Sequence, residues 1–139
     1  MIFSCGTGAK VVSVCAYGDL SAGVVWLGYR YGLLGKPEMI YPPSGPWRGL
    51  VRAGMGTFSG GGGAYLTFRR DSFRYVVYTA IGRGWGEKAG VAVERNGKLL
   101  TNQTCRGKPV SELGPDFFAD SGIPDDPAPF DPPTRNRKE

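Results

Sequence analysis

The sequence predicts an all-β protein, either an antiparallel sandwich or a small barrel, folded as a single domain. Segments rich in β-branched and aromatic residues alternate with clusters of glycine, proline, asparagine and aspartate, which is typical of short strands joined by turns. Before residue 109, no stretch keeps a helical spacing of apolar residues for long. With 139 residues, the chain is long enough to bury a core of its own.

Three strands are expected in the first half of the chain, where β-branched and aromatic residues gather between glycines. A segment rich in proline and glycine, residues 42–55, follows them, and we expect a loop there with Trp47 anchored on the body. The expected strands are 11–15, 24–31 and 39–41.

Two hairpins are expected in the second half. In the first of them, Ala64, Leu66 and Phe68 alternate with more polar residues, which is typical of a half-buried strand. In the second, Asn96 and Gly97 separate the strands and suit the positive φ angles of a type I′ turn. The expected strands are 64–69, 73–81, 91–95 and 99–104.

Four consecutive glycines lie between Ser59 and Tyr65. Glycine loses more conformational freedom on folding than any other residue, so a run of glycines is costly to order. Binding groups often lie on loops held by a rigid scaffold, and a costly glycine loop attached to a strand therefore favours a binding role. The alternative is a long flexible hairpin connection. A second glycine-rich loop, residues 82–90, contains a tryptophan and two cations, and tryptophan and arginine are frequent at interface hot spots. The alternatives here are a core tryptophan and ordinary solvated charge.

From these two loops we predict one site that binds a protein partner. Its residues are Ser59, Gly60, Gly61, Gly62, Gly63, Tyr65, Arg83, Trp85 and Lys88.

The composition changes at residue 109. Residues 1–108 hold fourteen lysines and arginines against five acids, whereas residues 109–139 hold three against seven. We therefore expect a basic β body and an acidic segment packed on it. Residues 110–121 predict a short helix with Ser111 as its N-cap, and a proline-rich tail follows. The acids among these prolines are expected to be solvated.

A basic body favours an acidic partner, such as nucleic acid, a membrane surface, an anionic polysaccharide or an acidic protein. Alternatively, the acidic segment folds back and neutralises part of this charge. No apolar run approaches the roughly 20 residues that span a bilayer. Aromatic residues interleave with the cations, so a single-stranded nucleic acid or another anionic polymer is the alternative partner. These aromatic residues are Tyr29, Tyr31, Trp47, Tyr65, Tyr75 and Trp85.

The chain lacks the residues of the common hydrolytic sites. It contains no histidine, which excludes Ser-His-Asp and Cys-His pairs. The acids of the body form no local motif, and the glycine stretch lacks the Gly-Lys-Ser/Thr of a phosphate-binding loop. The cysteines do not occur in the close pairs typical of zinc sites. We predict a protein that is not an enzyme and needs no metal or cofactor.

Three cysteines allow one disulfide and one free thiol in an oxidising compartment. Cys5 and Cys15 lie on two short apolar segments, close enough to face each other across a hairpin, whereas Cys105 could pair with either. The spacing does not decide between these pairings. Strand-like residues follow Met1 directly, without the basic and apolar regions of a signal peptide. Either the protein is cytosolic, or a leader has been removed, and we expect the latter.

Several motifs resemble a family of small exported proteins of Gram-negative bacteria. The resemblance, together with the strand-like positions of Cys5 and Cys15, leads us to expect a periplasmic protein with one disulfide, whose pairing stays open. The matching motifs are residues 3–5, 12–16, 29–32, 35–38, 59–65, 75–78, 82–85 and 114–118.

More distantly, the serine–glycine segment is similar to that of bacterial periplasmic lysozyme inhibitors and of immunity proteins against lysozyme-like effectors. Those proteins are all-β and insert a Ser-Gly-x-x-Tyr loop into the catalytic cleft of the enzyme. Ser59, Gly60 and Tyr65 match these residue types, with two further residues before the tyrosine. The resemblance implies an inhibitor or immunity protein whose residues 59–63 enter the cleft of a cell-wall-degrading enzyme.

Overall fold

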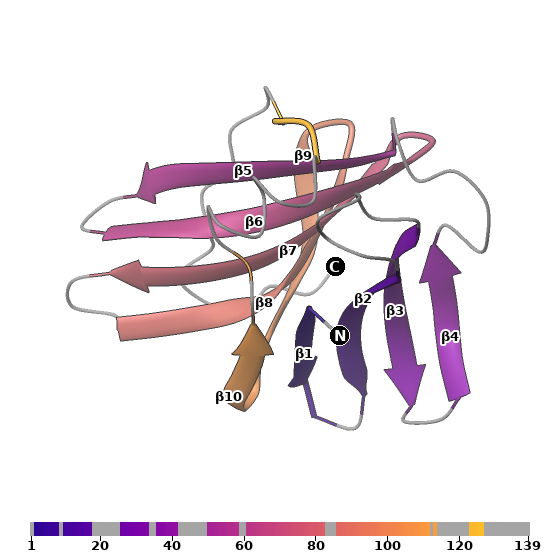
Figure 1. Ribbon diagram of the computed structural model, residues 1–139, viewed down its shortest axis with the longest axis horizontal. Helices are drawn as coiled ribbons and strands as arrows, with labels where there is room; N and C mark the ends of the chain where they lie inside the picture. The colour runs from indigo at the N-terminus through magenta and orange to yellow at the C-terminus, as the bar shows by residue number, and fades with distance from the viewer. Residues whose placement is uncertain are drawn as a thin grey trace.

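The structure, a computed structural model, describes residues 2–8, 10–17, 26–33, 36–41, 50–58, 61–82, 86–111, 113 and 123–126. Within these residues the chain forms ten strands and no helix (Figure 1). The strands make two antiparallel sheets of five strands each. The prediction of an all-β protein is confirmed.

The first sheet has the strand order β10-β1-β2-β3-β4, so the last strand of the chain pairs with the first. Its strands are β1 (Phe3–Gly6), β2 (Val11–Tyr17), β3 (Trp26–Leu33), β4 (Lys36–Tyr41) and β10 (Arg106–Ser111). The second sheet follows the order of the sequence, as a meander. Its strands are β5 (Val51–Phe58), β6 (Gly61–Arg70), β7 (Phe73–Gly82), β8 (Gly86–Arg95) and β9 (Lys98–Thr104).

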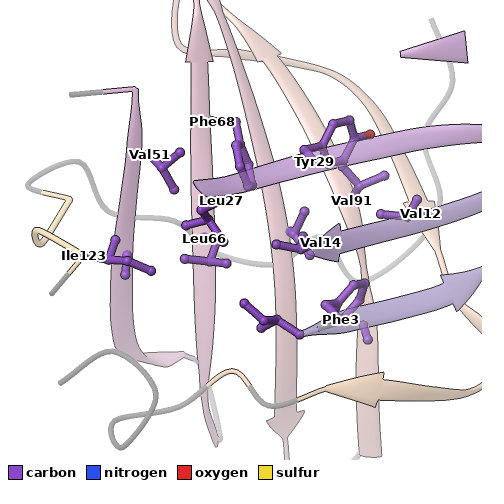
Figure 2. Packing of buried hydrophobic residues seen from close by; sticks show 14 of the residues in the cluster. Phe3, Val12, Val14, Leu27, Tyr29, Val51, Leu66, Phe68, Val91 and Ile123 are labelled. Atoms are coloured by element: carbon purple, nitrogen blue, oxygen red, sulfur yellow. The ribbon is translucent and has the colours of Figure 1, made fainter. Parts of the chain in front are cut away.

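The two sheets pack face to face, as in a sandwich. In Figure 1 the strands of the first sheet run across those of the second. Both sheets supply side chains to one buried cluster, and Figure 2 shows these side chains pointing into the space between the sheets. Those that are labelled in Figure 2 are Phe3, Val12, Val14, Leu27, Tyr29, Val51, Leu66, Phe68, Val91 and Ile123.

The two predicted hairpins are confirmed. Asn96 and Gly97 join β8 to β9 with φ angles of 51° and 81°, as a type I′ turn requires. Asp71, with a φ of 55°, lies in the turn between β6 and β7. Aspartate tolerates this left-handed conformation better than most residues. These turns set the register, so that Leu66 lies opposite Val77 and both side chains enter the core.

A disulfide joins Cys5 to Cys105, with 5.5 Å between their Cα atoms. Cys105 lies between β9 and β10, where the chain passes from the second sheet to the first, so the bond ties the two sheets together. One disulfide is therefore confirmed, and of the pairings that the sequence left open it is Cys5 with Cys105, and not Cys5 with Cys15. Cys5 lies opposite Val12 and faces the core, whereas Cys15 follows the inward-facing Val14 and is directed to the other side of β2.

Two predictions of secondary structure are wrong. Strand β5 begins at Val51 and so occupies the last five positions of the expected loop 42–55, and its glycines, Gly54 and Gly56, lower the strand signal. Val110 and Ser111 belong to β10, so no helix begins there. Of the remaining positions of the expected helix, only Leu113 is described, and its N–H donates to the Ser111 hydroxyl at 3.2 Å. Trp47 lies outside the described residues.

Near the end of the described chain, residues 123–126 lie along the outer edge of β5. Asp125 forms a parallel bridge with Ala53. The side chain of Ile123 joins the core cluster beside β5, as Figure 2 shows. Part of the acidic segment thus lies against the basic body.

Candidate functional site

The glycine stretch belongs largely to strand β6 and not to a loop. Gly61, Gly62 and Gly63 pair with β5 on one side and with β7 on the other. The prediction of a loop is wrong for these three residues, because hydrogen bonds to two neighbouring strands offset the weak strand preference of glycine. Phe58 pairs with Gly61, so the connection between β5 and β6 consists of Ser59 and Gly60, which lie outside the described residues.

Small residues gather across the strands at this end of the second sheet. Gly61, Gly82 and Gly86 form one row across β6, β7 and β8. Gly56 and Gly63 lie side by side in a second row, which continues to an alanine of β7. We call this part, residues 55–58, 61–64, 79–82 and 86–89, the glycine-rich end. In Figure 1 it projects at the left, beyond the strands of the first sheet.

The prediction of a loop is also wrong for residues 86–90, which belong to β8, and the two connections that remain of the predicted loops are attached at neighbouring positions. Gly61 begins β6 and pairs with Gly82, the last residue of β7. The connection between β5 and β6 therefore ends beside the point where the connection between β7 and β8 begins. Arg83 and Trp85 belong to the latter and lie outside the described residues. The structure thus brings together the strand ends that carry the two loops.

Exposed apolar side chains lie on one face of the glycine-rich end. Met55 is 52% exposed and Ile81 is 60% exposed. By strand alternation, both side chains are on the face that packs on the first sheet, and their exposure means that the first sheet does not cover them. Gly62 lies opposite Ile81 and adds no side chain beside it, whereas Met55 lies opposite Ala64. The exposed Glu87 lies opposite Ile81 on β8.

The two remaining described site residues lie on the opposite face. Lys88 is half-buried opposite Ala80. Tyr65 is buried and packs with Val76, Tyr78 and Ala92 in a second apolar cluster. Burial raises the pKa of Tyr65, and the carboxylate of Asp126 adds to this, while Arg74 opposes it. Tyr65 therefore supports the sheet from behind and does not line the exposed face.

A buried polar cluster that no sequence pattern indicated lies behind this sheet. The Asp126 carboxylate is fully buried, which corrects the expectation of solvated tail acids, whereas the neighbouring Asp125 is exposed. Thr67 donates its hydroxyl proton to Asp126 Oδ2 at 2.6 Å, and Arg69 and Arg74 each pair with the carboxylate at 3.3 Å. More than fifty residues separate Asp126 from these partners, so no local pattern could have indicated the cluster.

The described aromatic residues do not form an exposed platform for nucleic-acid bases. Tyr29 and Tyr65 are buried, and Tyr31 and Tyr75 pack against the core cluster. The rings of Tyr29 and Tyr75 stack on each other at 5.7 Å between centroids. Base stacking needs accessible ring faces, so the described part of the chain gives the nucleic-acid alternative no support.

In the part of the chain that the structure describes, no three metal-ligating side chains gather, and no helix is long and apolar enough to cross a membrane. No protein-family model matches the chain. Comparisons with curated proteins and with solved structures find no significant match.

Proposed function

We propose that this chain is a non-catalytic periplasmic binding protein, an inhibitor or immunity protein against a cell-wall-degrading enzyme. In this proposal the glycine-rich end enters the substrate cleft of the enzyme, with Ser59 and Gly60 at its tip. The single observation that carries the proposal is the projection of four paired strand ends, with a row of glycines across β6, β7 and β8, beyond the strands of the first sheet (Figure 1).

The shape of this end suits a narrow cleft. A strand without side chains is thinner than an ordinary strand, and pairing on both sides keeps Gly61, Gly62 and Gly63 in place before binding. A rigid insert loses little conformational freedom when it binds, which favours affinity. The finding that these glycines form a strand, and not the predicted loop, therefore supports the proposal, because a free glycine loop would have to become ordered on binding.

The exposed apolar side chains supply contact area. On the projecting part, Ile81 lies opposite Gly62, and Met55 lies opposite Ala64 on the same face of the sheet. Apolar side chains that become buried on association contribute roughly 25 cal/mol for each Å² removed from water. The exposed Glu87 beside them, together with Arg83, would meet charged groups at the rim of the cleft, where charges affect the association rate more than the affinity.

The compartment is supported by the Cys5–Cys105 disulfide, since structural disulfides persist in oxidising compartments such as the periplasm. A binding role in place of a catalytic one is supported by the absence of histidine from the chain. The enzyme class follows from the resemblance of the serine–glycine segment to lysozyme inhibitors. A nucleic-acid partner is not proposed, because the described aromatic residues are engaged in packing.

The test is a pull-down of purified lysozymes and peptidoglycan amidases by the immobilised chain, followed by an assay of cell-wall hydrolysis. The variant Met55→Lys/Ile81→Lys changes two exposed side chains of the glycine-rich end. We expect its affinity for any captured enzyme to fall by about tenfold or more, because two apolar contacts are replaced by desolvated charges.

The matched control is Leu33→Lys/Ile40→Lys, which changes two exposed apolar residues of the first sheet. It should bind like the unmodified chain, and circular dichroism should show that both variants keep the fold. Equal binding by the two variants would remove the glycine-rich end from the interface. Failure of the unmodified chain to bind or inhibit any enzyme of the panel would contradict the proposed enzyme class.

A further inference from the structure

The outer edge of β5 is already used for binding within the molecule. Ala53 donates its N–H to the carbonyl of Pro124 at 2.9 Å, and its own carbonyl accepts the N–H of Asp126 at 2.8 Å. Residues 123–126 thus add a short parallel strand to the sheet. Strand addition of this kind is a common way for a sheet edge to bind an extended peptide.

Side chains at both ends of this short strand are seated in the body. Ile123 is buried in the core cluster. Three residues later, Asp126 is held by the hydroxyl of Thr67 and by the guanidinium groups of Arg69 and Arg74. We call these three residues the carboxylate socket. The main chain of residues 123–126 forms hydrogen bonds with β5. The two buried side chains define a sequence pattern, an apolar residue followed three positions later by an acid.

The strands that carry the carboxylate socket are held in place by pairing with other strands and not by Asp126. Thr67 lies on β6 and Arg74 on β7, and each of these strands is paired on both sides. The second terminal nitrogen of Arg74, Nη1, also binds Glu94 Oε1 at 3.0 Å. Glu94 therefore keeps this guanidinium in position when Asp126 is absent. A site that is held in its binding geometry in advance loses less freedom on binding.

We propose that the edge of β5 and the carboxylate socket form a peptide-recognition groove, and that Ile123–Asp126 is its internal occupant. The external ligand is an extended segment of a partner protein with an apolar residue three positions before an aspartate. Such a segment binds by displacing residues 123–126 and taking over the hydrogen bonds of Ala53 and the ion pairs of Arg69 and Arg74. Ala53 and the carboxylate socket include none of the side chains proposed for contact at the glycine-rich end.

The charge of the body fits this ligand. Residues 1–108 carry a net positive charge, so an acidic segment is attracted to them at long range. The ligand competes with an occupant tethered to the same chain, whose effective concentration is high. Partner segments are therefore expected to extend beyond four residues, toward Met55 and Thr57, whose backbone groups point to the same edge as those of Ala53.

The test uses the full-length chain carrying Asp126→Ala, labelled for NMR, and a synthetic peptide with the sequence of residues 121–127. We expect shifts at the Ala53 amide and at the Thr67 and Arg74 side chains. The same peptide with asparagine in place of its second aspartate should bind about tenfold more weakly. The unmodified chain should also bind the peptide about tenfold more weakly than Asp126→Ala does, because its groove is occupied.

A folded Asp126→Ala chain that shows no shifts at millimolar peptide, or that binds both peptides equally, would overturn the proposal. If this variant does not fold, hydrogen exchange of the unmodified chain decides. The Ala53 amide should then exchange about tenfold or more faster than the Leu66 amide, since displacement requires local opening. Exchange of both amides only through global unfolding would show that residues 123–126 do not leave the groove, and the proposal would fail.

Discussion

The ring of Tyr65 lies directly over Gly54 on the neighbouring strand. The two residues are paired across β5 and β6, and a Cβ atom added to Gly54 would fall within the space of the tyrosine ring. This contact explains why a glycine lies inside strand β5, although glycine has a low strand preference. The aromatic ring covers the backbone that a glycine leaves exposed, and it does so only because the glycine has no side chain.

Gly54→Ala is accordingly expected to lower the free energy of unfolding by about 1–3 kcal/mol, because the added methyl group must push Tyr65 out of its place. Urea unfolding measures this loss. Gly6→Ala is the matched control, since a Cβ there would meet only the Lys10 carbonyl oxygen, at 4.0 Å, and little change is expected. In a Tyr65→Ala background the cost of Gly54→Ala should shrink, and an unchanged cost would contradict the contact.

Local patterns predicted the hairpins of the second sheet, whereas long-range contacts decided the rest. The Asn96 and Gly97 turn is encoded by two adjacent residues, and it appears as expected. Strand β5 could not be predicted in the same way, because its stability depends on Tyr65 lying over Gly54 and on pairing with β6. The disulfide partner of Cys5 depended on the register of β1 with β2, which spacing along the chain does not give.

The sequence indicated only part of what the structure shows at the glycine-rich end. The sequence pointed to the glycine stretch and to the segment from Gly82 onward, and the structure places the strand ends of both side by side. It did not indicate that Gly61–Gly63 would be paired on both sides. It also gave no sign of Met55 and Ile81 as the exposed residues, since an apolar residue in a strand is ordinarily assigned to the core. Their exposure follows from the extent of the first sheet, which is a property of the whole fold.

The Cys5–Cys105 bond closes a loop with a sequence separation of 100 residues. Cys5→Ala/Cys105→Ala should lower the free energy of unfolding by about 2–5 kcal/mol, because the unfolded chain regains the freedom that the bond removes. Urea unfolding under non-reducing conditions measures the change, with Cys15→Ala as the control. Peptide mapping without reduction should recover Cys5 linked to Cys105. A peptide that links Cys15 to either of the others would contradict the assignment.

Tyr78 is fully buried, and its hydroxyl donates to Asn102 Oδ1 at 2.7 Å. Burial raises the pKa of Tyr78 from 10.0 to about 12, although the hydrogen bond to Asn102 opposes this. The unfolded chain therefore loses this proton near pH 10, while the folded chain keeps it until about pH 12. Between these two pH values the folded state binds more protons than the unfolded state. The contribution of Tyr78 to the free energy of unfolding is therefore fully present below pH 10 and is lost as the pH rises, by up to about 1.4 kcal/mol per pH unit for this group.

Burial also raises the pKa of Tyr29, with Tyr31 and Tyr75 adding to it, so Tyr29 contributes a loss of the same sign at alkaline pH. Unfolding by urea between pH 9 and pH 12 measures the combined slope. Tyr78→Phe should make the decline above pH 10 shallower, because it removes one group that titrates differently in the two states. Identical slopes for the variant and the unmodified chain would show that Tyr78 ionises at the same pH in both states.

The two adjacent aspartates of the short strand on β5 provide the last prediction. Asp126 is buried among Thr67, Arg69 and Arg74, whereas Asp125 is exposed. Asp126→Asn keeps the size of the side chain but removes its charge. It should lower the free energy of unfolding by about 1–3 kcal/mol, the range for hydrogen bonds to charged groups.

The loss should remain below the roughly 3–5 kcal/mol expected when a buried ion pair is broken completely. The reason is that Glu94 still pairs with Arg74, while the Arg69 side chain is 42% exposed and can be hydrated. Asp125→Asn, one residue away, should change stability by less than about 0.5 kcal/mol, as expected for an exposed side chain. Urea unfolding of the two variants in parallel makes the comparison. Equal losses would mean that the Asp126 carboxylate is not held by the carboxylate socket.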